Sequence, residues 1–170
     1  PPPQSNSVKR DTDWTIGDAL ALAALSWAFS PNKSTASNSS RTTFDRAVEA
    51  YKRGNDVSAR NLFAEAAAQG HSHAQYALGH MQLHGQGGPK DVTQAIHWHR
   101  KAAEQGSPDA QTVLGGWHVE GFGVPRDYAA ALSWFQRAAA QGHAHAFTWL
   151  GSLYSRGLGV AQDYATALQW

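Results

Sequence analysis

The stretch ALSWFQRAAAQG, residues 131–142, ends in a Gln-Gly pair that recurs along the chain. The pair stands at Gln69-Gly70, Gln105-Gly106 and Gln141-Gly142, with a spacing of 36 residues both times. A fixed period of this length is typical of tandem repeats, and it predicts one supersecondary unit copied several times. Further landmarks follow the same step: Leu78-Gly79, Leu114-Gly115 and Leu150-Gly151, then Asp91, Asp127 and Asp163, then Trp98, Trp134 and Trp170.

Each unit has the pattern of two helices. In the first helix, expected over residues 72–83, the apolar residues Ala74, Leu78 and Met81 recur at helical spacing and form a core-facing stripe. A Gly-x-Gly turn then ends this helix, because glycine readily adopts the backbone angles of a tight turn. The same stripe recurs in the later units as Ala110, Leu114 and Trp117, then as Ala146, Leu150 and Leu153.

The start and end of the second helix are also marked. We expect Asp91, Asp127 and Asp163 to cap its free amides with a side-chain oxygen. Gly106 and Gly142 suit the left-handed position that follows a helix C-terminus.

Two further recurring residues have predicted packing roles. Gly79, Gly115 and Gly151 should permit a close crossing of paired helices. We expect Trp98, Trp134 and Trp170 to be buried between helices. Truncation of Trp98 or Trp134 to alanine would then cost about 3 to 5 kcal/mol through cavity formation.

The segments ALSWFQRAAAQG and LGSLYSRGLGVAQDYATALQW resemble the Sel-one-like repeat, a longer-looped relative of the tetratricopeptide repeat. The resemblance divides the chain into units 71–106 and 107–142 and a truncated unit 143–170. Residues 44–70 resemble a preceding tetratricopeptide-like unit with a short turn at Gly54-Asn55-Asp56. The resemblance implies an all-α fold, a right-handed α-solenoid of antiparallel helix pairs. It also implies that the first helices line a concave face used for scaffolding.

The residues before the repeats have a different composition. Residues 1–13 are polar and rich in proline, and residues 30–43 are rich in Ser, Asn and Thr, so we expect disorder in the first and a linker in the second. Residues 14–29 contain TIGDALALAALSWAF, which predicts an apolar helix. This helix is too short to span a bilayer on its own. It is compatible with a docked helix, a fragment of a membrane anchor or an uncleaved targeting remnant.

The overall composition indicates no particular class of partner and no particular cellular compartment. A net charge of +1 with 16% charged residues gives no field that would attract nucleic acid. The chain has no cysteine, which excludes disulfides and thiolate metal ligands.

The expected binding surface lies opposite the core stripe on the first helices. It mixes aromatic, histidine and small polar side chains, a composition suited to holding a peptide or a helix of another protein. We therefore predict a protein or peptide partner, with membrane contact through residues 14–29 as an option, and no small-molecule substrate. The predicted concave residues are His73, Tyr76, His80, Asp109, Thr112, Gly116, His145, Thr148 and Ser152.

Histidines provide the main alternative to a binding role. His80 and His84 are one helical turn apart and could share a divalent metal or support hydrolysis. His73 stands about 16 Å from His84 along a straight helix, so it cannot bind the same ion. The chain has no Gly-x-Ser-x-Gly elbow and no cysteine nucleophile. We therefore predict a non-catalytic scaffold or adaptor without metal or cofactor, and keep a membrane-tethered regulator and a His80/His84 activity as alternatives.

Overall fold

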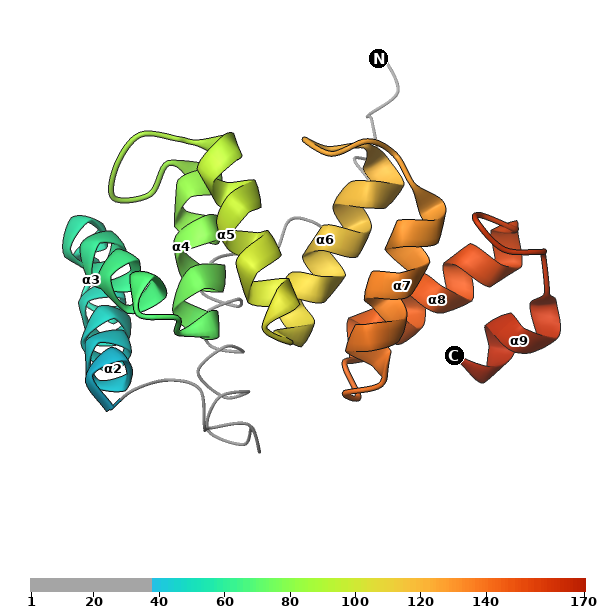
Figure 1. Ribbon diagram of the computed structural model, residues 1–170, viewed down its shortest axis with the longest axis horizontal. Coiled ribbons are helices and arrows are strands. Elements are labelled where there is room, and N and C mark those ends of the chain that lie inside the picture. The colour runs from blue at the N-terminus through green and yellow to red at the C-terminus, as the bar shows by residue number, and fades with distance from the viewer. Residues whose placement is uncertain (1–37) are drawn as a thin grey trace, which may run out of the picture.

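The computed structural model describes residues 38–170, which form eight helices and, within that range, no strand. Consecutive helices pack as pairs, and the pairs follow one another along the long axis of the molecule (Figure 1). The predicted all-α solenoid of helix pairs is confirmed. The pairs are α2 (Asn38–Lys52) with α3 (Asp56–Ala68), α4 (Ser72–His84) with α5 (Val92–Glu104), α6 (Pro108–Glu120) with α7 (Tyr128–Ala139), and α8 (Ala144–Arg156) with α9 (Tyr164–Gln169).

The first helix begins earlier than the sequence pattern predicts. Helix α2 starts at Asn38, although the linker was expected to continue to residue 43. Ser40 and Thr43 are buried on the same face as Phe44 and Ala47, and the Thr43 hydroxyl donates to Glu65 of α3 at 3.4 Å. Small hydroxyl side chains can face a core when a partner is within reach, and average composition does not reveal this. The predictions for residues 1–13 and 14–29 concern a part of the chain outside the described range.

The helix ends follow the local rules. Asp91 accepts a hydrogen bond from Gln94 N at 2.9 Å, Asp127 accepts one from Ala130 N at 2.9 Å, and Asp163 caps α9 in the same way. Gly106 has φ of 92° and follows the last turn of α5. Its amide donates to Ala103 O and the next amide donates to Ala102 O, which is the Schellman arrangement. The capping predictions are therefore confirmed.

The aromatic ring at the centre of each of the first three helix pairs is not the tryptophan. Phe63, His99 and Phe135 recur at the 36-residue step and have no exposed surface. Trp98 and Trp134 are only half-buried, and Lys101 and Arg137 lie over their outer faces. The expected burial of these two tryptophans between helices is only partial, because the next position along the helix points at the facing helix. Trp170 is 41% exposed and stacks on Phe147.

The recurring glycines make room for close neighbours on the facing helix, and at two of them the neighbour is one of these rings. A Cβ added at Gly79 would clash with the His99 ring, and one added at Gly115 would lie 2.7 Å from Phe135. At Gly151 an added Cβ would lie 3.3 Å from Ala167 O. The predicted close crossing therefore has a direct steric cause in all three units.

Glutamines connect one unit to the next. Gln105 Nε2 donates to Gln75 Oε1 at 3.0 Å, and Gln141 Nε2 donates to Gln111 Oε1 at the same distance. Gln75 in turn donates to Ala67 O at 3.2 Å and Gln111 donates to Ala103 O at 3.1 Å. Because these contacts recur at the repeat step, they fix the stacking of neighbouring units.

Alanine substitutions at two adjacent residues of α7 distinguish the fully buried ring from the half-buried one. Phe135→Ala should lower the free energy of unfolding by about 3 to 5 kcal/mol, since it leaves a cavity against Gly115. Trp134→Ala should cost about 1 to 2 kcal/mol, because its ring is already partly solvated. Urea unfolding followed by circular dichroism measures both. Equal losses would contradict this assignment of the core.

Candidate functional site

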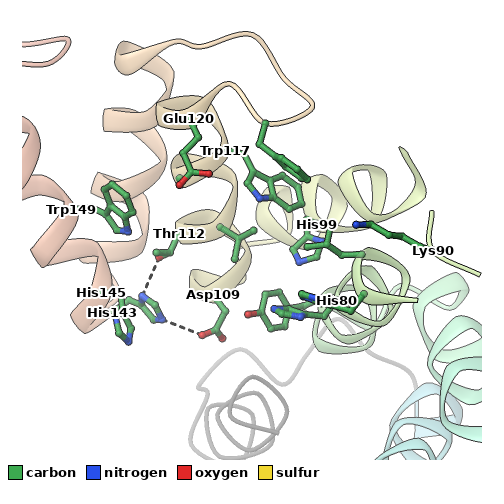
Figure 2. A pocket seen from close by; sticks show the side chains of 16 residues that line it. His80, Lys90, His99, Asp109, Thr112, Trp117, Glu120, His143, His145 and Trp149 are labelled. Carbon is green, nitrogen blue, oxygen red and sulfur yellow. Dashed lines mark hydrogen bonds and ion pairs between the residues drawn. The ribbon is translucent and has the colours of Figure 1, made fainter. Parts of the chain in front are cut away.

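A groove with a volume of about 360 Å³ opens on the first helices of three successive units. Side chains reach it from α4, α6 and α8, and they converge on one hollow (Figure 2). The lining consists of Tyr76, His80, Leu83, His84, Lys90, His99, Asp109, Thr112, Val113, Gly116, Trp117, Glu120, Phe122, His143, His145 and Trp149.

Most residues predicted for the concave face lie in this groove. The structure brings together Tyr76, His80, Asp109, Thr112, Gly116 and His145. Three predicted residues do not line it. His73 is 9% exposed and lies beside Phe44 and His71, whereas Thr148 and Ser152 lie on α8 outside the lining. The prediction took the same helix positions in every unit. These positions do not all reach one groove, because each unit is rotated relative to the one before it.

Several lining residues were not predicted from the sequence, although some of them stand at positions where the chain departs from its own repeat. His99 stands where the neighbouring units have Phe63 and Phe135. Trp117 stands where they have Met81 and Leu153. Departures from an otherwise regular repeat therefore cluster at the groove. No comparable signal marks Lys90, whose position depends on the path of the loop.

The α4 wall is built from packed rings. The Tyr76 ring lies 5.5 Å from His80 and 5.3 Å from His99, centroid to centroid. The His80 and His84 rings stack at 5.2 Å, and the Trp117 ring lies 4.9 Å from His99. His80 was predicted on the face opposite the core stripe, yet it is only 6% exposed, and the His99 ring of α5 packs against it.

Burial determines the charge of this wall. It lowers the pKa of His80 to about 3, helped by the neighbouring His99 and His84. It lowers the pKa of His99 to about 4, against the effect of the hydrogen bond to Ala95 O, and it raises the pKa of the Tyr76 hydroxyl. Both imidazoles are therefore neutral near pH 7.

The hydrogen bond of His99 determines its tautomer. Nδ1 lies 2.8 Å from Ala95 O, and a carbonyl can only accept, so Nδ1 carries the proton. Nε2 is then an acceptor, and it has no hydrogen-bond partner among residues 38–170. His80 Nδ1 is likewise buried without a partner in that range.

A cross-brace joins α8 to α6 at the other end of the groove. His143 Nε2 lies 3.1 Å from Asp109 Oδ1 and His143 Nδ1 lies 3.0 Å from Thr112 Oγ1 (Figure 2). The carboxylate, imidazole and hydroxyl follow one another in the order found in the catalytic triad of a hydrolase. Thr112 nevertheless lies inside α6, where the neighbouring amides are used by the helix, so an oxyanion hole cannot form beside it. The arrangement therefore serves to position the two helices.

A metal site finds no support in the described range, and the membrane alternative concerns residues 14–29, which lie outside that range. Residues 38–170 contain no group of three side chains that could hold a metal ion. His80 and His84 stack face to face, with 19° between their planes. In the same range, every helix is too short or too polar to cross a bilayer.

The fold and groove define an α-solenoid of stacked helix pairs with one hollow face. The Sel1 repeat matches residues 49–71, 72–107, 108–143 and 145–170. The chain therefore belongs to the Sel1 repeat family. Sel1 repeat proteins generally mediate protein–protein interactions.

Two solved structures are similar to this chain. A Sel1 repeat protein from Oxalobacter formigenes has a TM-score of 0.72 and 32% identity, over 91% of this chain and 66% of that one. The antigen c5321, a protective antigen of uropathogenic Escherichia coli with an SLR fold, has a TM-score of 0.71 and 32% identity, over 93% of this chain and 32% of that one. This chain thus spans less than two thirds of either protein. No curated protein sequence matches it.

The buried histidines predict a loss of stability in acid. The unfolded chain binds a proton at each of these imidazoles near pH 6.5, whereas His99 in the folded chain binds one only near pH 4. Its stabilising contribution is therefore complete above about pH 6.5 and is lost as the pH falls toward 4. His99→Phe should reduce the loss between these values by up to about 3 kcal/mol, measured by urea unfolding at several pH values.

The reciprocal substitution provides the control. Phe135→His places an imidazole at the equivalent position of the next unit and should make stability fall more steeply with acid. An unchanged pH dependence in His99→Phe would contradict the assignment.

Proposed function

We propose that this chain is a non-catalytic scaffold or adaptor that holds a segment of another protein in the groove formed by α4, α6 and α8. The observation that supports this most directly is the contrast between two classes of repeat position. Residues that build the solenoid recur from unit to unit, whereas residues that line the groove differ. Such a contrast is expected when a regular framework presents one specific surface.

The groove positions illustrate this contrast. Tyr76 is replaced by threonine in the next two units, and His80 is replaced first by Gly116 and then by Ser152. The solenoid positions, in contrast, keep Leu-Gly and the capping aspartate in all three units from residue 71 onward, and Gln-Gly at the end of units 71–106 and 107–142. Architecture therefore does not determine which side chains face the groove.

The chemistry of the lining favours a peptide segment. The groove is lined by three aromatic residues, and aromatic side chains are frequent anchors in protein interfaces. Trp149 is partly exposed, whereas Tyr76 and Trp117 are each 5% exposed and present little ring surface to the groove. Asp109 contacts His143 through Oδ1, and its other carboxylate oxygen provides an acceptor that can orient a main chain. A groove that crosses three units also suits an extended or helical segment better than a compact metabolite.

The proposal is tested by reversing charges at the rim of the groove. Lys90 and Glu120 line the groove and are exposed, so Lys90→Glu with Glu120→Arg should leave the fold intact. The full chain and this variant are used to capture proteins from native lysate. The dissociation constant of each purified partner is then measured by calorimetry. We expect the variant to bind at least about tenfold more weakly, a difference of about 1.4 kcal/mol.

The matched control reverses two charges on the exposed side of α5. Arg100→Glu with Glu104→Arg keeps the same number of substitutions and lies outside the groove lining. This control should bind the partner as the unchanged chain does. Equal binding by the groove variant, or equal weakening by the control, would place the partner elsewhere.

A further inference from the structure

One glycine in the groove is not required by the fold. Gly116 lies inside α6, where glycine is less favourable than alanine. A Cβ added there would meet no atom within 4 Å, whereas at the adjacent Gly115 it would meet Phe135. The equivalent positions in the neighbouring units carry the side chains of His80 and Ser152. The consequence of Gly116 is therefore an open floor in the middle of the groove.

A second residue provides a hydrogen-bond acceptor that the fold does not use. His99 occupies the core position filled by Phe63 and Phe135, so packing alone would accept phenylalanine there. Its Nδ1–H donates to Ala95 O, which leaves Nε2 as a fully buried acceptor without a partner in the described range. Because a buried acceptor without a donor is unfavourable, a ligand that donates would be stabilised there.

The charges that line the groove also favour a ligand that donates hydrogen bonds. Asp109 and Glu120 lie on the α6 side of the groove, before and after Gly116 in the helix, and Lys90 is the one lysine or arginine in the lining. The imidazoles of His80 and His99 are neutral near pH 7. An anionic group would face the exposed carboxylate of Glu120 and that of Asp109, which also contacts His143, and a purely apolar group would leave the His99 acceptor unpaired.

We propose that the groove recognises an arginine side chain of the partner segment, held over Gly116 between the aromatic walls. A guanidinium is planar, stacks on a partly exposed ring such as Trp149, and has five donors for the imidazole and carboxylate acceptors. An ammonium fits less well, because it is compact and strongly hydrated. This inference rests on the proposed function and specifies the ligand class of the same groove.

Blocked tripeptides test the inference with the full chain. The probe is acetyl-Ala-Arg-Ala-amide, and the comparison peptides carry citrulline, lysine, leucine or glutamate in place of arginine. Citrulline is the closest match, since it keeps the planar shape and removes the charge. Binding is followed by NMR titration to about 10 mM peptide, and the arginine peptide should bind at least about tenfold more tightly than the citrulline peptide.

Two variants and one control locate the site. Gly116→Leu fills the open floor, where an added Cβ meets no atom within 4 Å, and should raise helix stability, so weaker binding would not reflect unfolding. His99→Phe restores the ring of the neighbouring units and removes the acceptor. Each should weaken the arginine peptide at least about tenfold. Ser152→Leu, at the equivalent position one unit later and outside the lining, should leave affinity unchanged.

The outcomes distinguish the inference from the proposed function. Equal binding of the arginine and citrulline peptides, unchanged affinity in Gly116→Leu, or no binding of the arginine peptide would overturn arginine recognition. If the leucine or glutamate peptide binds instead and Gly116→Leu blocks it, the groove remains a binding site and only the ligand class is wrong. A partner that binds the full chain and Gly116→Leu equally would contradict both.

Discussion

The two middle helix pairs, α4 with α5 and α6 with α7, depend on a buried ring packed against a glycine on the facing helix. Phe135 occupies the space that a side chain at Gly115 would need, and His99 does the same at Gly79. This contact brings two helices close enough to share a core of alanines. Removal of solvent from the ring supplies the main stabilisation, and the glycine sets the distance at which the helices cross. The glutamine pairs then fix how one helix pair stacks on the next.

One of these rings also belongs to the groove, which links architecture to function. His99 packs on Tyr76 and Trp117 as a core residue, yet it is an imidazole and it lines the hollow. The unit of residues 71–106 therefore has an imidazole, which burial keeps neutral, where the neighbouring units have phenylalanine. The exchange makes the fold sensitive to acid and places an acceptor inside the groove. Positions that break the repeat are thus informative about binding, and positions that keep it are informative about the fold.

The sequence alone predicted those features that depend on local rules. The 36-residue period, the capping aspartates, the Gly-x-Gly turns and the apolar stripe of Ala74, Leu78 and Met81 follow from helix geometry and turn chemistry. Trp98 and His99 could not be ranked in this way, because adjacent residues on a helix differ by only about 100 degrees in direction. The groove was only partly predicted, because which side chains meet depends on the rotation between units. The start of α2 was missed because polar residues at Ser40 and Thr43 face the core.

The tryptophans offer a direct measurement of where a partner binds. Trp117 and Trp149 line the groove, whereas Trp98 and Trp134 lie outside it, and each indole N–H gives its own signal in a nitrogen–proton NMR spectrum. During titration with a purified protein partner, we expect the signals of Trp117 and Trp149 to shift while those of Trp98 and Trp134 stay in place. Shifts confined to Trp98 and Trp134 would show that the partner binds the opposite face, and would contradict the groove as the binding site.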